Sequence, residues 1–110
     1  MQPQWHVQVL LSMVVFGFNP QEALDAPRVC IGAGLPHPDS LSDCTIHLED
    51  GISEATAGGL QARGHVVKMV SGWQRSLFGR GQLIRVQTED GKLAYSAGSD
   101  PRGDGAAVAF

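Results

Sequence analysis

The chain has 110 residues, of which 43% are hydrophobic and 17% charged, and its formal net charge is −3. This length allows one domain with one core. Its eight lysine and arginine residues are scattered and its aromatic residues are few, which argues against a nucleic-acid interface and against a basic patch for anionic membranes. We therefore expect no nucleic-acid partner, and the composition leaves the compartment open.

Residues 3–18 (PQWHVQVLLSMVVFGF) predict one helix that is apolar over most of its circumference. Gln4, Gln8 and Ser12 recur at every fourth position and form a single narrow polar stripe. A helix of this kind must be buried on several sides, and the rest of the chain contains little of comparable hydrophobicity. We therefore expect this helix to need more protein than the chain supplies.

The same apolar segment is not a typical targeting signal. It has no positively charged region before it and no small-residue cleavage site after it. It is also shorter than the roughly 20 residues that a membrane-spanning helix needs. We interpret it as a core helix and expect no membrane span.

A second, short helix is predicted within residues 19–27. Asn19 suits the N-cap, Pro20 the first helical position, and Glu22 the position from which a side chain can reach back to the cap. Pro27 disfavours the helical conformation at the residue before it and so ends the helix.

Two short strands are expected next, at residues 29–31 and 45–49, with a loop rich in Gly, Pro, Ser and Asp over residues 32–43 between them. A third helix is predicted over residues 54–63, capped by Ser53. It carries a weakness at Gly58-Gly59, since each glycine costs about 1 kcal/mol relative to alanine.

A strand at residues 65–70 and a glycine-punctuated connection at 71–81 precede the clearest hairpin. Its strands are predicted at 82–87 and 92–97, around a turn at 88–91.

The tail after the hairpin is predicted to be irregular over residues 98–105. Residues 106–110 either add an edge strand or fray. Helices cluster early in the chain and strands late, which favours an α+β fold with helices packed on an antiparallel sheet.

Four residues invite a metal interpretation, with the spacing C-x6-H-x6-C-x2-H: Cys30, His37, Cys44 and His47. Structural zinc sites usually begin with cysteines two to four residues apart, so we expect no metal here. One cysteine pair is no disulfide framework, and free or buried thiols are favoured over a bridge. Cysteine–histidine catalysis needs only spatial proximity, but the sequence supplies no electropositive niche that would activate a thiol.

Two loops have both a functional and a structural interpretation. Residues 76–82 (SLFGRGQ) are glycine-rich but lack the phosphate-loop pattern and precede a strand, which favours a tight entry into the hairpin. Asp100 and Arg102 could bind a ligand or could form a local ion pair that fixes the tail. The Arg-Gly-Asp tripeptide at 102–104 matches an adhesion motif, but so short a match arises readily by chance. For His6, on the first helix, we expect a satisfied core histidine.

Six blocks, in this order along nearly the whole chain, resemble the γ-glutamyltranspeptidase (glutathione hydrolase) family. They are residues 1–4 with 6–10, then 19–28 (NPQEALDAPR), 48–52 (LEDGI), 63–65 (RGH), 78–82 (FGRGQ) and 98–107 (GSDPRGDGAA). The resemblance is to the C-terminal part of the family's small subunit. It implies that residues 1–110 form a single partial domain of an N-terminal-nucleophile (Ntn) hydrolase, whose fold is a four-layer αββα sandwich.

Family members are made as a precursor that cuts itself into a large and a small subunit. A threonine at the new N-terminus of the small subunit then attacks the γ-glutamyl carbonyl, and the acyl group passes to water or to an amine. The resemblance places that threonine and the glycines of the oxyanion hole upstream of Met1, and the substrate-carboxylate arginine in the large subunit. The threonines of this chain match none of the family's threonine motifs: Thr45, Thr56 and Thr88.

We therefore expect no catalytic, substrate-binding or metal residue and no cofactor in this chain. Four residues match family positions that we interpret as structural: His65, Arg80, Asp100 and Arg102. Two departures stand out: Trp5 occupies a position where the family has glycine, which would crowd its helix, and Gly58-Gly59 weaken a helix that should be better formed.

These expectations leave two main functional readings, with a zinc or thiol enzyme as a third. In the first, the chain is a γ-glutamyltransferase-like fragment that is inactive alone and needs a large-subunit-like or upstream small-subunit segment as partner. In the second, it is a non-catalytic interaction protein that associates, with itself or another chain, through the apolar face of its first helix. The sequence leaves open whether the chain is a truncated gene product or a stand-alone protein.

Overall fold

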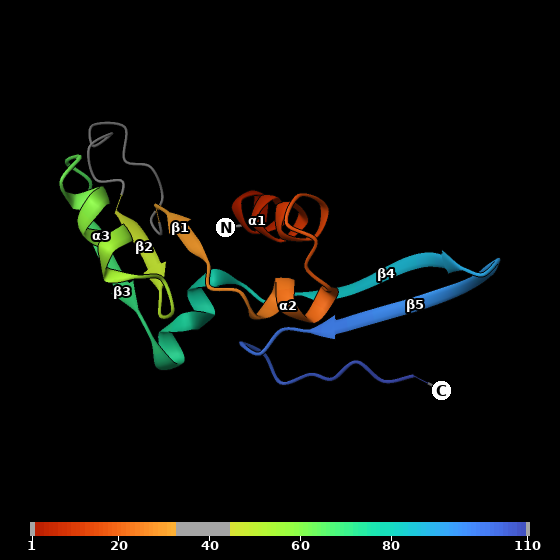
Figure 1. Ribbon diagram of the computed structural model, residues 1–110. Helices are drawn as coiled ribbons and strands as arrows, with labels where there is room; N and C mark the ends of the chain where they lie inside the picture. The colour runs from red at the N-terminus through yellow and green to blue at the C-terminus, as the bar shows by residue number, and fades with distance from the viewer. Residues whose placement is uncertain (1, 33–44, 110) are drawn as a thin grey trace. The chain divides into compact units, whose positions relative to one another are not determined.

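A computed structural model of the chain describes residues 2–32 and 45–109 (Figure 1). The chain divides into two compact units. The first comprises residues 1–5 and 27–79, and the second comprises residues 6–26 and 80–110. Together they contain helices and antiparallel strand pairs in the mixture that an α+β fold requires, which confirms the predicted fold class.

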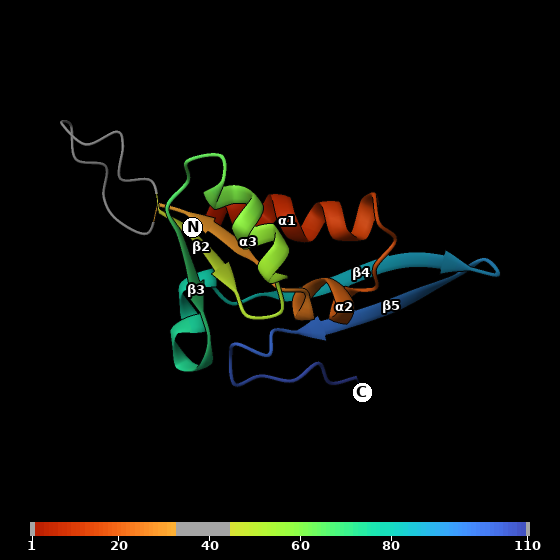
Figure 2. The same cartoon turned by 60° about the vertical axis from the view of Figure 1, so that its left-hand side comes forward.

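The first unit contains a three-stranded sheet in the order β1 (Val29–Ile31), β2 (Ile46–Glu49), β3 (Val67–Val70). Strands β1 and β2 are antiparallel, as predicted, whereas β2 and β3 are parallel. The expectation of a wholly antiparallel sheet is therefore wrong at this pair. The physical reason is helix α3 (Glu54–Gln61), which connects β2 to β3 and carries the chain back to the same end of the sheet (Figure 2).

The buried cluster of the first unit lies on one face of this sheet. It contains Cys30, Val70 and Phe78, with Leu77 packed against it. Phe78 ends η1, a 3₁₀ helix over Gly72–Phe78, where the sequence predicted a glycine-punctuated connection. The last residue of η1 anchors the connection to the core, which explains why this segment is ordered into turns.

The second unit is built on a hairpin of β4 (Gln82–Glu89) and β5 (Lys92–Ser99), which are paired along their whole length (Figure 1). The predicted hairpin is confirmed, but its turn has two residues where we expected four. Asp90 and Gly91 both have positive φ, +49° and +77°, as a tight turn that follows the twist of the strands requires.

Helix α2 (Pro20–Asp25) is fastened to the end of β5. Its predicted capping box is present: the Asn19 side chain accepts from the Glu22 N–H at 2.9 Å, and the Asn19 N–H donates to the Glu22 carboxylate at 2.8 Å. The Gln21 side chain donates to the Ser99 carbonyl at 2.9 Å and accepts from the Ser99 N–H at 3.0 Å. This pair of hydrogen bonds joins residues that are 78 positions apart in the sequence.

Helix α1 runs over Gln2–Val14, shorter than the predicted segment, and Val9 is its buried residue. Most of its apolar surface is exposed, and the two residues that follow it are exposed as well: Val7, Leu10, Leu11, Val14, Val15 and Phe16. No helix of the described residues is long and apolar enough to cross a membrane. Residues 106–109 form no strand.

A pair of glycine substitutions tests the packing of α2 on β5. A Cβ added at Gly98 would lie 2.8 Å from the Gln21 nitrogen and 2.9 Å from the Pro20 carbonyl carbon, so Gly98→Ala should lower the free energy of unfolding by about 1–3 kcal/mol. Gly58, inside α3, has nothing within 4 Å of its Cβ position, and Gly58→Ala should raise that free energy by about 0.5–1 kcal/mol. Urea titration followed by circular dichroism measures both. A Gly98→Ala midpoint at or above that of the parent would contradict the packing described.

Candidate functional site

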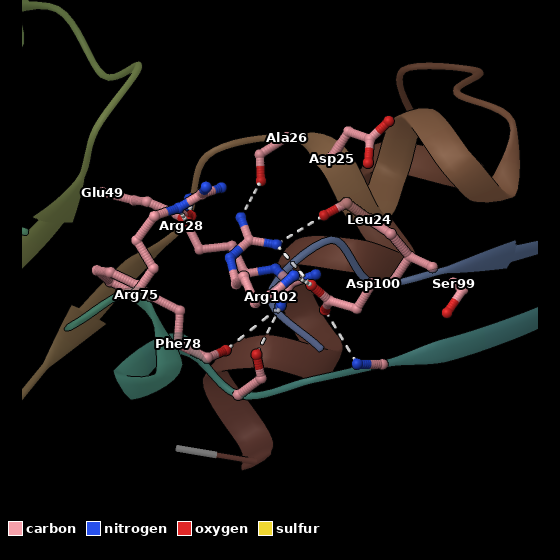
Figure 3. Close-up of polar contacts among 12 residues, drawn as sticks. Leu24, Asp25, Ala26, Arg28, Glu49, Arg75, Phe78, Ser99, Asp100 and Arg102 are labelled. Carbon is pink, nitrogen blue, oxygen red and sulfur yellow. Dashed lines mark hydrogen bonds and ion pairs between the residues drawn. The ribbon is translucent and has the colours of Figure 1, made fainter. Parts of the chain in front are cut away.

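The most deeply buried charge in the first unit is the carboxylate of Glu49, at the end of β2. Its residue is 0% exposed, and it accepts the Arg28 backbone N–H at 2.8 Å and the Arg75 Nε–H at 2.6 Å (Figure 3). A buried carboxylate is stable only when it is paired and hydrogen-bonded. Glu49 therefore ties the segment before β1 and helix η1 to the middle strand of the sheet.

The Arg28 side chain is buried as well. Its guanidinium donates to the carbonyls of Phe78 and Gly79, both at 3.4 Å, and its Cζ lies 5.4 Å from the centre of the Trp5 ring. This geometry is that of a cation–π contact. We expected the Trp5 side chain to crowd its helix. Instead, its ring lies over the buried guanidinium of Arg28. Sequence reasoning missed this group, although both arginine and glutamate lie inside blocks that resemble the family.

In the second unit, Asp100 and Arg102 form a buried ion pair that also bonds to two other segments of the chain. One oxygen of Asp100 accepts the Gly81 N–H at 2.9 Å, and the other accepts the backbone N–H and Nη1–H of Arg102, both at 3.0 Å. The same guanidinium donates to the carbonyl of Leu24 at 2.8 Å and to that of Ala26 at 3.0 Å (Figure 3).

The hydrogen bonds from Arg102 stabilise the C-terminal end of helix α2. The last carbonyls of a helix have no intrahelical partner, and here a buried arginine supplies donors to them. The Arg102 side chain is 0% exposed, so it offers no group to a ligand or to a receptor that reads an exposed Arg-Gly-Asp tripeptide. Of the two interpretations left open for Asp100 and Arg102, the geometry favours the local ion pair.

The residues proposed for metal or thiol chemistry are only partly described. His37 and Cys44 lie outside the described residues. Cys30 and His47 stand opposite each other in the β1–β2 pair. Within residues 2–32 and 45–109, no three His, Cys, Asp or Glu side chains gather closely enough to hold a metal ion. Cys30 is buried with a free thiol, and burial raises its pKa above the ordinary value of 9.0, which disfavours the reactive thiolate.

A hollow of about 430 Å³ lies between the sheet of the first unit and η1. Its lining contains the polar residues His47, Lys68, Gln74 and Ser76 and the apolar residues Val70 and Leu77. The Nδ1 of His47 is buried and has no hydrogen-bond partner among the described residues. Within the described residues this nitrogen has no orienting hydrogen bond, whereas a histidine that acts as base for a serine or thiol nucleophile is held by one.

The remaining candidate residues lie at the surface. His6 is exposed, so the expectation of a core histidine is wrong; α1 buries Val9, and its other side chains are half-buried or exposed. His65, Arg80, Thr56 and Thr88 are also exposed. In the glycine-rich segment, Phe78 closes η1, Gly79 has a φ of +77°, and β4 starts at Gln82, which is the tight entry into the hairpin that we favoured.

Removing the Arg102 side chain tests the structural role of the buried pair. Arg102→Met should lower the free energy of unfolding by about 3–5 kcal/mol, because it leaves the Asp100 carboxylate buried without its counter-charge. Asp100→Asn in the same chain should restore part of that loss. Arg85→Met, on the exposed surface of β4, is the matched control and should change stability by less than about 0.5 kcal/mol. Equal effects of Arg102→Met and Arg85→Met in urea titrations would contradict the assignment.

The Cys30 thiol should react slowly in the folded protein. In a Cys44→Ser background, its reaction with Ellman's reagent at pH 8 should be at least about tenfold slower than in urea, because a buried thiol with a raised pKa forms little thiolate. A fast reaction in the folded state would contradict the burial described.

The same thiol makes stability depend on pH. Since burial raises the folded-state pKa, the unfolded chain loses the proton first as pH rises. The contribution to stability is complete below pH 9.0 and falls above it. Unfolding titrations of the parent should show this fall, and Cys30→Ala should lack it.

Comparison with known proteins shows which protein family this chain matches. The family model for gamma-glutamyltranspeptidase matches residues 1–110. The chain is 33% identical over 107 residues to the glutathione hydrolase-like YwrD proenzyme of Bacillus subtilis (strain 168). That match takes in 97% of this chain but only 19% of the relative, so the chain spans about a fifth of the length of this relative.

Solved structures give the same picture. A cephalosporin acylase from Bacillus halodurans matches 98% of this chain with 33% identity and a TM-score of 0.77, over 18% of its own length. An acivicin-inhibited gamma-glutamyltranspeptidase matches 91% of this chain with 21% identity and a TM-score of 0.69, over 47% of its own length. This chain therefore covers only a part of each of these relatives.

Proposed function

Because the chain belongs to the γ-glutamyltranspeptidase family, we propose that it supplies one structural part of an Ntn-hydrolase body and that it contributes to γ-glutamyl transfer or hydrolysis only together with polypeptide that carries the nucleophile. One observation carries this proposal: the family model spans all 110 residues, whereas the same residues correspond to 19% of the curated relative. The remaining polypeptide of such relatives has no counterpart in these residues.

The arrangement of charges supports a structural role. Four charged side chains are buried among the described residues, Glu49 and Arg28 in the first unit and Asp100 and Arg102 in the second, and each hydrogen-bonds to backbone. Acyl transfer needs an activated nucleophile and preorganised donors at one place. We infer that the described residues supply neither, so that another segment completes the chemistry that we propose.

A relative indicates what such a part can contribute. The acivicin-inhibited γ-glutamyltranspeptidase is described as having a C-terminus with critical roles in autoprocessing and catalysis. The six sequence blocks of this chain resemble the C-terminal part of the family's small subunit. We therefore propose that these residues act as that region does, by holding the catalytic body in its working shape.

A second candidate function rests on helix α1. Its exposed apolar side chains form a surface larger than scattered single residues would give, and such surfaces mark contact sites. In this alternative, the chain is a non-catalytic protein that associates with itself or with another chain through α1.

An activity assay separates the two candidates. The purified chain should release no p-nitroaniline from γ-glutamyl-p-nitroanilide above the buffer rate, because it lacks the nucleophile. Co-expression with the part of the Bacillus subtilis relative outside the matched region should give hydrolysis, with the intact relative as positive control. Release by the chain alone, abolished by Ser76→Ala or Thr56→Ala, would overturn the proposal. A defined oligomer of the chain alone that Leu10→Lys dissociates, with no activity in either mixture, would favour the alternative.

A further inference from the structure

The hollow between η1 and the sheet of the first unit has the size and the mixed lining of a small-molecule site. Its volume of about 430 Å³ lies within the range of such sites, roughly 300–1,000 Å³. All of its lining residues belong to the first unit, so the hollow is formed within one compact body. Figure 2 shows η1, in teal, directly after β3 at one end of this sheet.

Strand register brings two polar residues of the sheet side by side in this hollow. His47 on β2 pairs with Lys68 on the parallel strand β3. Side chains alternate between the two faces of a strand, so Val70, two positions after Lys68, lies on the same face. All three residues line the hollow. The imidazole and the ammonium group therefore occupy neighbouring positions along one wall.

The His47 ring has one nitrogen that cannot serve a ligand. Its Nδ1 is shut off from solvent and has no hydrogen-bond partner among the described residues. A proton on that nitrogen would be a buried donor without an acceptor, which is rarer in proteins than a buried acceptor without a donor. We assign the proton of the neutral ring to Nε2 for this reason, and Nε2–H is then a hydrogen-bond donor on the other edge of the ring.

The charge available to a ligand in the hollow is positive. Lys68 is exposed and makes no ion pair with another described residue. The carboxylate of β2, Glu49, is buried and already accepts the Arg75 Nε–H at 2.6 Å and the Arg28 backbone N–H at 2.8 Å. Because Arg75 balances the charge of Glu49, that carboxylate does not cancel the attraction of Lys68 for an anion.

Helix η1 supplies donors from the opposite wall. Gln74 and Ser76 are exposed and line the hollow, and their side chains carry an amide NH₂ and a hydroxyl group. Val70 and Leu77 add an apolar patch, with Val70 3% exposed and Leu77 half-buried. Small-molecule sites commonly combine an apolar lining with a few polar groups that fix the orientation of the ligand.

We propose that this hollow binds a small organic anion, in which a carboxylate or phosphate group is carried on a short apolar body. Lys68 supplies the charge, and the Nε2–H of His47 donates a hydrogen bond from the same wall. Gln74 and Ser76 donate from η1, and the two apolar lining residues contact the body of the ligand. The positive charge disfavours a cation or a metal ion. This binding site is independent of the proposed function, since it needs no polypeptide outside this chain.

Titrations of the isotope-labelled chain, followed by the amide resonances of Lys68 and Ser76, test the site. Butyrate and inorganic phosphate are the two anions, and propylammonium is the control with a similar apolar body and the opposite charge. At least one anion should shift these resonances saturably, with a dissociation constant below about 10 mM at low ionic strength. Propylammonium should give no saturable shift.

Three lysine variants locate the binding. Lys68→Gln should weaken the binding of the anion at least about tenfold, because it removes a charge-assisted hydrogen bond. Lys68→Arg keeps the charge and should weaken binding less than about threefold. Lys92→Gln, on the hairpin of the second unit, removes the same charge elsewhere and should leave the affinity unchanged. Circular dichroism checks that each variant keeps the parent fold.

The outcomes identify the ligand class and decide the proposal. Saturable binding of butyrate alone assigns the site to carboxylates, and saturable binding of phosphate alone assigns it to phosphates. No saturable shift with either anion, equal binding of propylammonium, or equal affinities of Lys68→Gln and Lys92→Gln would overturn the site. None of these results depends on hydrolysis of a γ-glutamyl substrate, so failure of the proposed function would leave this inference standing.

Discussion

The second unit depends on one buried guanidinium. Arg102 reaches the carbonyls of Leu24 and Ala26 at the end of α2, and its partner Asp100 holds the Gly81 N–H just before β4. Three segments far apart in the sequence therefore meet at one ion pair. A hydrophobic contact would tolerate sliding between these segments, whereas hydrogen bonds from a planar, charged group fix both their distance and their orientation. The position of α2 over the end of the hairpin follows from this geometry.

Features that depend on residues close together in the sequence were predicted more accurately than the pairing of strands that are far apart. The capping box of α2 and the hairpin could be predicted because each depends on residues a few positions apart: Asn19 with Glu22, and the strands around Gly91. The parallel pairing of β2 with β3 could not be predicted, because it depends on where α3 returns the chain. The 3₁₀ helix before Gly79 was missed for a related reason, since the burial of Phe78 orders it and the local sequence alone gives a weak signal.

In the candidate site, too, the long-range contacts could not be predicted from the sequence. The sequence placed Asp100 and Arg102 two residues apart, but only the structure shows both buried and bonded to the backbone of α2 and to Gly81. Glu49 and Arg28 escaped notice because nothing in the blocks that contain them indicates burial, and their contact spans 21 residues. His6 was misplaced because apolar neighbours on a helix suggest burial, while α1 is covered along only one line of its surface. Contacts between residues far apart in the sequence therefore stabilise much of the first unit.

The division of the chain into units sets an order of assembly. Nearly all of the first unit is one continuous segment, residues 27–79, whereas the second unit joins residues 6–26 to residues 80–110. During synthesis, the continuous segment emerges complete while the second unit still lacks both strands of its hairpin. The contact between Gln21 and Ser99 closes a loop of 78 residues, and long loop closures slow folding. The contacts of the first unit therefore close shorter loops than those of the second, in which α2 meets β5 only after residues 92–99 have been made.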